Sequence, residues 1–258
     1  MRSIDINCDL GEGFGIYHTA PEEQIFPWIS SANIACGFHA GDPQTMRRSV
    51  QLAIAHGVAI GAHPGTPDLA GFGRRAMELS NSELENALVY QIGALEAFCR
   101  TVGTFIHHVK PHGWLYNEAA RNPRIAEVIA SVVKTLNSSW ILFGLAGSEL
   151  PRAARQLGVP HAAEAFIDRA YEPDGSLASR GLRGSVIVHP ETAVQQCLDI
   201  VLRSRVRTAS GVEVPLAADT LCVHGDNPAA SDILPLVRDC LHENGVDVRP
   251  WKPDAQSG

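Results

Sequence analysis

The sequence predicts an α/β protein folded as a single-domain (β/α) barrel over residues 1–258. Short apolar runs and longer amphipathic segments alternate along the chain, a pattern typical of a parallel sheet covered by helices. About eight such units fit into 258 residues, a length that α/β barrels use for one domain. A regular barrel and an irregular or seven-stranded one are both open, and a doubly wound open sheet is the alternative.

The composition indicates a folded, acidic protein. Hydrophobic residues make up 45% of the chain, enough for a buried core. The 28 acidic residues exceed the 21 basic ones, giving a net charge of −7 and arguing against a nucleic-acid partner. No apolar run approaches the ~18 residues that span a bilayer. Asp5 and Asp9 interrupt the stretch that a signal peptide needs. We therefore expect a cytoplasmic protein with no membrane partner.

The cysteines predict buried free thiols in a reducing compartment. No pair has C-x-x-C spacing, which excludes a zinc ribbon or a thioredoxin-type motif. The six positions are Cys8, Cys36, Cys99, Cys197, Cys222 and Cys240.

Apolar runs and capping signals place the elements in order. The predicted strands are Ile4–Leu10, Ser31–Cys36, Val58–Ala62, Thr104–Val109, Trp140–Leu145, Ala163–Phe166, Ser185–Val188, Thr220–Val223 and a short Gly245–Val248. The predicted helices are Pro43–His56, Asn81–Thr101, Pro123–Leu136, Glu149–Gln156, Glu191–Arg203 and Pro228–Glu243. Asp42-Pro43, the capping box Ser80-x-x-Glu83 and Asn227-Pro228 mark helix starts, and Gly57 and Gly245 mark helix ends.

Polar, glycine-containing clusters follow most of the predicted strands. They are Asn7–Glu12, Cys36–Asp42, Ala62–Gly65, Lys110–Gly113, Glu164–Tyr171 and His224–Asp226. In a barrel the carboxyl ends of all strands meet at one rim, where active sites are built. The sequence therefore predicts that these distant segments form one pocket.

Asp5, Asn7 and Asp9 alternate with apolar residues and so share one face of the first strand. One interpretation is a half-exposed strand with its polar face in water. In a barrel both faces are covered, so the carboxylates need buried partners. Function and structure are both open for Asp5 and Asn7, whereas Asp9, at the rim, favours function.

Histidines precede acidic residues in two of these clusters. His39 lies three residues before Asp42 and His224 two before Asp226, each between a strand and a helix. Capping alone would explain Asp42. For the two histidines, adjacent glycines favour a ligand contact over a loop hydrogen bond.

A mixed nitrogen and oxygen metal site is one interpretation of these residues. Asp9, His63 and His112 would be its ligands, with Asp226 as a fourth candidate, but no H-x-H or H-x-x-x-H pair supports it. The His107-His108 pair lies within a predicted strand, where core or surface roles are favoured over ligation.

Lys110 is one of only 3 lysines among the 21 basic residues, and it stands at a strand end. An ammonium there suits a carboxylate, phosphate or oxyanion, and a structural ion pair is the alternative. The loop from Pro64 to Gly73, followed by Arg74-Arg75, suggests an anion-binding flap, with a solvated loop as its alternative. The chain has no Walker A motif and no G-x-S-x-G elbow.

Several long motifs closely resemble the LamB/YcsF family, which comprises the A component of 5-oxoprolinase. The matching segments are Ile4–Gly15, Ser30–Pro43, Gly61–Gly65, Gly71–Arg75, Val109–Gly113 with Leu115–Asn117, Glu164–Tyr171 and Cys222–Asp226. The resemblance spans nearly the whole chain. Thr66 and Trp114 depart from it, where Tyr and Ala are expected.

The resemblance implies a barrel of the glycoside hydrolase/deacetylase type and ATP-dependent opening of the 5-oxoproline lactam to L-glutamate. It also implies two companion subunits, B and C. ATP with Mg²⁺ is the expected cofactor, bound by the companions or at a different site here. A homo-oligomer is also open.

The hypothesis assigns catalysis to Asp9, Glu12, His39, His63, Lys110 and His112, and substrate or phosphate binding to Asn7, Asp42, Arg75, His224 and Asp226. Asp9, Glu12, His39 or His63 would act as general base, and His112 or His224 would protonate the departing nitrogen. Lys110 and Arg75 would hold phosphate or the substrate carboxylate. The alternatives are a free-standing metal-dependent deacetylase-like hydrolase and a non-catalytic substrate-binding subunit.

Overall fold

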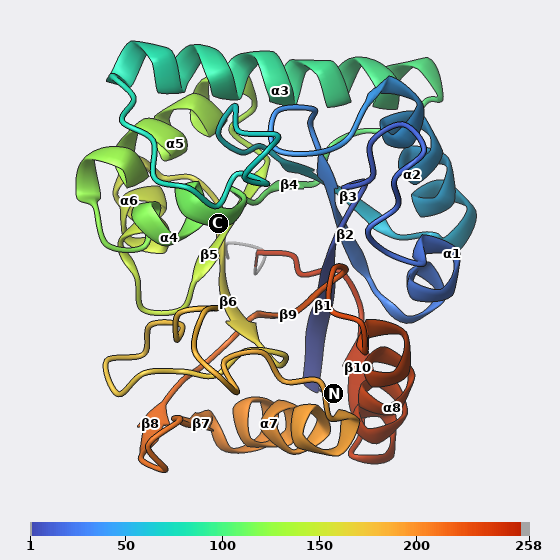
Figure 1. Ribbon diagram of the computed structural model, residues 1–258, viewed down its shortest axis with the longest axis vertical. Helices are drawn as coiled ribbons and strands as arrows, with labels where there is room; N and C mark the ends of the chain where they lie inside the picture. Colours follow the sequence, from blue (N-terminus) through green and yellow to red (C-terminus); the bar gives the residue numbers. More distant parts are fainter. Residues whose placement is uncertain (1, 254–258) are drawn as a thin grey trace, which may run out of the picture.

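The computed structural model of this chain describes residues 2–253, and its centre is a closed parallel barrel. The barrel strands are β1 (Arg2–Leu10), β2 (Ser31–Ala35), β3 (Ala59–His63), β4 (His108–Val109), β5 (Ile141–Leu145), β6 (His161–Phe166) and β9 (Thr220–His224). They pair in that order, and β9 closes the ring on β1 (Figure 1). The strand β10 (Val246–Val248) pairs with the amino-terminal residues of β1. The predicted barrel is confirmed in its seven-stranded form, and the open sheet is wrong.

Helices surround the barrel (Figure 1). They are α1 (Glu22–Ile25), the 3-10 helix η1 (Phe26–Trp28), α2 (Pro43–His56), α3 (Asn81–Thr101), α4 (Gly113–Ala119), α5 (Pro123–Leu136), α6 (Glu149–Leu157), α7 (Pro190–Arg203) and α8 (Ala230–Glu243). The capping signals of α2 and α3 are confirmed. Asp42 accepts from the amides of Gln44 and Thr45, and the Ser80–Glu83 capping box is present.

The predicted start of the last helix and one predicted strand are wrong. Helix α8 begins at Ala230 and not at Pro228, because Asn227 accepts from the Ala229 amide in a preceding turn. Residues 185–188 form no barrel strand: Val186 makes an isolated bridge to Arg169, and β6 pairs directly with β9. The segment is too short and too exposed at its end, where Val188 is 41% exposed, to replace a barrel strand.

Several short elements have no counterpart in the prediction. These are α1, η1, α4 and the antiparallel hairpin of β7 (Arg205–Arg207) with β8 (Glu213–Pro215). Each has at most seven residues, too few to show a hydrophobic period. Strand β4 is also shorter than predicted, with only His108–Val109 in the ladder.

The barrel interior is polar along β1. Asp5, Asn7 and Asp9 are all buried and contact side chains from other strands. The alternate residues Ile6 and Cys8 belong to the apolar core. The half-exposed interpretation of β1 is therefore wrong, and the buried polar side chains must have partners inside the barrel.

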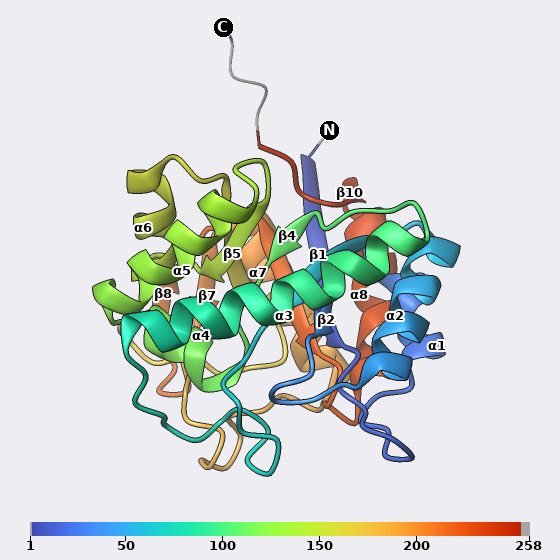
Figure 2. The ribbon, with the colours of Figure 1, turned by 90° about the horizontal axis from the view of Figure 1, so that it is seen from above.

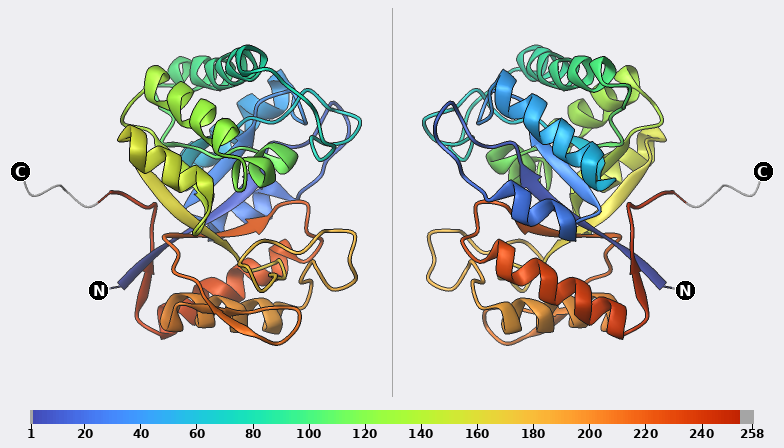
Figure 3. Two further views of the ribbon diagram at one scale, coloured as in Figure 1. Left: turned by 90° about the vertical axis from the view of Figure 1, so that its left-hand side faces the viewer. Right: turned by 90° about the vertical axis from the view of Figure 1, so that its right-hand side faces the viewer.

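The loops that follow the barrel strands gather at the end opposite the amino terminus (Figures 2 and 3). Within residues 2–253, no helix is both long and apolar enough to cross a bilayer. Cys8, Cys36, Cys99, Cys197 and Cys222 are free and buried, as predicted, whereas Cys240 is partly exposed.

Candidate active site

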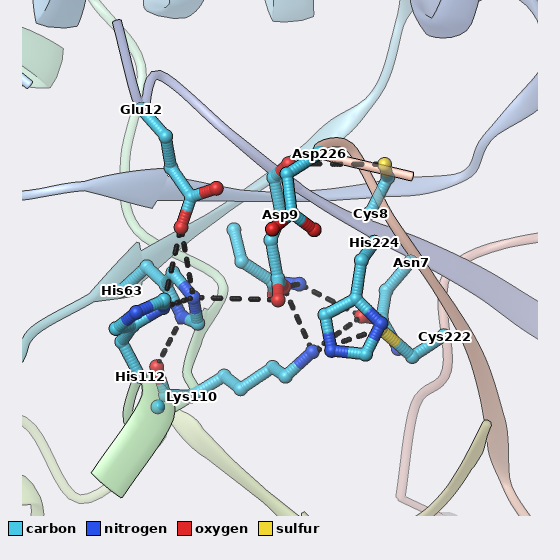
Figure 4. Close-up of polar contacts among 12 residues, drawn as sticks. Asn7, Cys8, Asp9, Glu12, His63, Lys110, His112, Cys222, His224 and Asp226 are labelled. Carbon is cyan, nitrogen blue, oxygen red and sulfur yellow. Dashed lines mark hydrogen bonds and ion pairs between the residues drawn. The ribbon is translucent and has the colours of Figure 1, made fainter. Parts of the chain in front are cut away.

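A buried ammonium group occupies the centre of the polar interior. Lys110 follows β4, and its Nζ lies 2.8 Å from Asp9 Oδ1 (Figure 4). The same Nζ lies 2.9 Å from Glu164 Oε1. It also lies 3.2 Å from Asn7 Oδ1 and 3.0 Å from Cys222 Sγ. We call these five residues the lysine centre. Three strands and the β4–α4 connection supply it, so only the closed barrel brings the residues together.

The lysine centre holds opposite charges in a site closed to bulk water. Burial opposes the charge of Lys110, but Asp9 and Glu164 outweigh it and keep the Lys110 pKa well above its usual value. Burial likewise opposes the charge of Asp9, yet His63 and Lys110 hold the Asp9 pKa well below its usual value. Asp9 thus stays a carboxylate and Lys110 an ammonium, an arrangement suited to binding and orienting a polar substrate.

A second group, the histidine cluster, adjoins Asp9 and contains Glu12, His39, His63 and His112. Glu12 Oε1 lies 3.2 Å from His39 Nε2, 3.2 Å from His112 Nδ1 and 3.8 Å from His63 Nε2. His63 Nε2 lies 3.0 Å from His112 Nδ1 and 3.5 Å from Asp9 Oδ2 (Figure 4). His39 stacks on His112 with ring centroids 3.7 Å apart.

Burial also shifts the histidine cluster. It lowers the pKa of His39 to about 3, and it lowers the pKa of His112. Burial opposes the charge of Glu12, but the neighbouring His112 and His39 rings outweigh it and hold the Glu12 pKa far below its usual value. The cluster therefore combines the neutral imidazoles of His39 and His112 with the Glu12 carboxylate.

Asp5 lies deeper in the barrel, on the same face of β1. Its Oδ1 accepts from the hydroxyls of Ser30 at 2.6 Å and Ser31 at 2.8 Å, and its Oδ2 accepts from Thr220 at 2.6 Å. Burial raises the pKa of Asp5 to about 6 despite these hydrogen bonds. Since its partners are neutral hydroxyls, Asp5 is a structural acid at the barrel floor.

His224, at the end of β9, is held by Asp168. Its Nδ1 lies 3.0 Å from both Asp168 oxygens, and its ring stacks on Phe166 at 5.2 Å. Burial opposes the charge of Asp168, but His224 outweighs it and lowers the Asp168 pKa. A carboxylate that orients an imidazole leaves Nε2 free to exchange a proton with a ligand.

A cavity of about 750 Å³ opens above these groups. Its lining includes Asp9, His63, Lys110, His112, His224, Trp114, Tyr116 and Phe166, together with Arg74, Arg121, Arg169 and Arg180. Arg169 is 5% exposed, and it donates hydrogen bonds to the carbonyls of Ser185 and Ala178. Burial and the nearby Arg180 lower the Arg169 pKa to about 10. The cavity is suited to an anionic ligand.

Not every residue selected from the sequence faces this cavity. Asp42 caps α2 and also accepts from the Gly15 amide. Arg75 is paired with Asp68, so Arg74 and not Arg75 lines the cavity. Asp226 pairs with Arg74 at 2.5 Å.

Of the predicted metal set, Asp9, His63 and His112 lie side by side, whereas Asp226 pairs with Arg74 outside this group. Asn7, Glu12 and His39 are buried behind the cavity wall, within the lysine centre or the histidine cluster.

Sequence reasoning missed several residues that build the site. Asn33 donates to Asn7 and Asp9 and accepts from His108 Nε2 at 2.7 Å, which gives His108 its predicted core role. Arg169 lies in the predicted Glu164–Tyr171 cluster, where it follows Asp168 directly in the sequence. An acid and an arginine side by side after a strand are a sequence signal that could have identified Arg169 as a site residue. Asn33 is a single polar residue inside an apolar run, which is a weaker signal.

The fold and the site define a parallel β/α-barrel protein with an enclosed lysine, carboxylate and histidine centre beneath an arginine-lined cavity. A family model described as the LamB/YcsF family matches residues 4–256. The chain belongs to this family, and the resemblance of its motifs is confirmed.

Curated relatives and a solved structure agree with this family. The chain is 49% identical over 249 residues to the 5-oxoprolinase A-type subunit of Tolumonas auensis, covering 96% of this chain and 99% of that protein. It is 50% identical to the protein of the same name from Geobacillus thermodenitrificans, covering 99% and 100%. It is also similar to the crystal structure of a lactam utilization protein from Thermus thermophilus, with a TM-score of 0.90, 46% identity and coverage of 96% and 99%.

Proposed function

We propose that this chain is the lactam-opening component of an ATP-dependent 5-oxoprolinase, which converts 5-oxoproline to L-glutamate. The observation that carries the proposal is the joint placement of Lys110, Asp9 and the histidines at the floor of one cavity with Arg169 in its wall. Relatives about half identical over nearly their whole length are named for this enzyme, and a structural neighbour is named for lactam use.

The substrate's two functional groups match two parts of the cavity. 5-Oxoproline is a small acid with a carboxylate and a lactam. The Arg169 guanidinium suits the carboxylate, because Arg presents paired donors to planar anions. The lactam then faces Lys110 and His63, where an ammonium can stabilise negative charge on oxygen.

The chemistry requires an activated lactam, since the five-membered amide is resonance-stabilised and unstrained. Transfer of the γ-phosphoryl group of ATP to the lactam oxygen makes the ring carbon electrophilic. Water then adds to that carbon, and the carbon–nitrogen bond breaks as the nitrogen takes a proton. A second water releases phosphate and leaves glutamate.

The residues divide these tasks by their charge states. The Lys110 ammonium stabilises the developing oxyanion, and Asp9, its ion-pair partner, fixes the position of that ammonium. His63 or His112 removes the proton from water. His224, oriented by Asp168, faces the same cavity and donates a proton to the departing nitrogen.

We further propose that subunits B and C complete the enzyme in the cytoplasm. The name of the relatives specifies one component of a multi-subunit enzyme. The chain contains no Walker A motif, so ATP with Mg²⁺ binds to the companions or at the arginine-lined side of this cavity.

The decisive experiment follows glutamate release from 5-oxoproline, first with this chain alone and then with both companions, with and without ATP. We expect release only with ATP and the companions. Release of acyl groups from acylated substrates without ATP, abolished by chelator, would favour a free-standing metal-dependent hydrolase. Binding of 5-oxoproline with full turnover by a Lys110→Ala complex would favour a non-catalytic binding component.

A further inference from the structure

We propose that the histidine cluster is a binding site for a divalent transition-metal ion, with zinc as the best match. The ligands are His63 Nε2, His112 Nδ1 and Glu12 Oε1. His63 and His112 also line the cavity, so the ion would lie at its wall. The site does not depend on the identity of the substrate.

The proton positions of the two histidines support ligation. His63 Nδ1 lies 2.7 Å from the Lys110 carbonyl oxygen, and His112 Nε2 lies 2.8 Å from the Phe72 carbonyl oxygen. A carbonyl only accepts, so these two nitrogens carry the protons of the neutral rings. The lone pairs of His63 Nε2 and His112 Nδ1 then face each other at 3.0 Å. A cation between them turns this repulsion into binding.

Both carbonyls are the outer partners that metal-binding histidines usually have. They fix each ring's tautomer and its orientation. Phe72 adopts a left-handed backbone conformation with φ of 54°, which is uncommon outside glycine. The loop is thus bent where its carbonyl meets His112, and such strain is often found at functional sites.

The spacing of the three ligand atoms fits a tetrahedral ion. Zinc binds imidazole nitrogen and carboxylate oxygen at about 2.0–2.2 Å, which places neighbouring ligand atoms about 3.3–3.6 Å apart. The three pairs here are 3.0 Å, 3.2 Å and 3.8 Å apart. Small side-chain movements would equalise them. A single proton could bridge only one of the pairs.

His39 plays a different part, as a positioning residue. Its ring is parallel to that of His112, with an interplanar angle of 4°. Two stacked imidazoles cannot both direct their in-plane lone pairs at one ion. His39 Nε2 instead lies 3.2 Å from Glu12 Oε1 and orients the carboxylate.

Three protein ligands leave a fourth position, as in catalytic zinc sites. Asp9 Oδ2 lies on this side, 3.5 Å from His63 Nε2. It would complete the site or accept a hydrogen bond from a metal-bound water.

A rival group of Asp9, Cys222 and His224 is less suited to a cation. Lys110 Nζ lies 2.8 Å from Asp9 Oδ1 and 3.0 Å from Cys222 Sγ. Its ammonium would repel a metal ion at that position. The two groups can therefore be distinguished by mutation. A metal in the histidine cluster is lost when His63 or His112 is replaced, and a metal in the rival group is lost when His224 is replaced.

The test uses the full isolated chain with Zn²⁺ and Co²⁺ as probes and needs neither substrate nor ATP. We expect one tightly bound Zn²⁺ per chain by mass spectrometry of the dialysed protein, and intense visible bands of tetrahedral Co²⁺. His63→Asn and His112→Asn should each weaken Zn²⁺ binding by at least about 100-fold, and His39→Asn by about 10–100-fold. His224→Asn is the matched control and should keep wild-type affinity.

Failure of wild-type chain to bind either ion saturably would overturn the site, as would full affinity in folded His63→Asn and His112→Asn variants. Loss of the metal in His224→Asn alone would assign it to the rival group and also overturn the proposal. If the ligand variants fail to fold, X-ray absorption spectroscopy of the wild-type Zn²⁺ form counts the imidazole ligands of the ion. Two imidazoles support the site, and fewer than two contradict it. Because turnover is not measured, a negative result leaves the proposed function intact.

Discussion

Asp5 and Asp9 lie four residues apart on the same face of β1, yet their surroundings differ. Asp5 accepts only from the hydroxyls of Ser30, Ser31 and Thr220, and burial raises its pKa to about 6. Asp9 contacts the Lys110 ammonium and His63, and its pKa falls well below the usual value. One acid stabilises the barrel floor and the other belongs to the site. The charge of the partner, and not the type of residue, decides whether the pKa of the buried carboxyl rises or falls.

Replacing Lys110 should have the largest effect. Lys110→Ala leaves Asp9 and Glu164 buried without their counter-ion, which should lower the free energy of unfolding by about 3–5 kcal/mol. Glutamate release by the assembled complex should fall by at least about 1,000-fold. Chemical denaturation and single-turnover assays measure the two effects. A folded variant with normal turnover would remove Lys110 from the mechanism.

Asp9→Asn should have the next largest effect, and it tests the comparison directly. The amide keeps the size of the side chain but removes the charge facing Lys110 and His63. Turnover should fall by about 100–1,000-fold while the fold is retained. Asp5→Asn is the matched control and should keep turnover within about threefold. Equal losses in both variants would contradict the division between floor and site.

Arg169→Met should mainly weaken binding. Removing a guanidinium that binds a carboxylate should raise the KM for 5-oxoproline by about 10–100-fold, with a smaller change in kcat. Steady-state kinetics of the complex separate the two parameters. Arg75→Met provides the contrast, since Arg75 is paired with Asp68 away from the cavity. A larger change in KM for the Arg75 variant would support the expectation from the sequence that Arg75 binds phosphate or the substrate carboxylate.

The pH dependence of stability tests the comparison from the side of Asp5. The Asp5 pKa of about 6 in the folded chain exceeds its ordinary value of 3.8, so the stability from protonated Asp5 is complete below about pH 4. It is lost as the pH rises to about 6. Relative to Asp5→Asn, the wild type should lose on the order of 2–3 kcal/mol between pH 4 and 7. If the free energies of unfolding of the wild type and Asp5→Asn differ by the same amount at every pH, the assignment is wrong.

The sequence predicted the fold class and many of its boundaries well. Helices α2, α3 and α5 have the predicted bounds, and the caps predicted at the starts of α2 and α3 are present, because capping is a local interaction. The segment 185–188 misled the prediction, since it lies in a loop in which Val186 bridges to Arg169 and Val188 is exposed. A short apolar run does not by itself determine whether the segment becomes a strand of the barrel or part of a loop.

The sequence by itself determined which polar residues stand at the strand ends. Because the carboxyl ends of barrel strands meet at one rim, it also predicted that these residues come together. Only the tertiary structure decided their partners. It placed Arg169 and Arg74 in the cavity wall, directed Arg75 to Asp68, and brought Glu12 to His63 and His112. Strand periodicity fixes which face a side chain occupies, but distances between strands depend on closure of the whole sheet. Charge states follow from those distances and from burial, which no local segment contains.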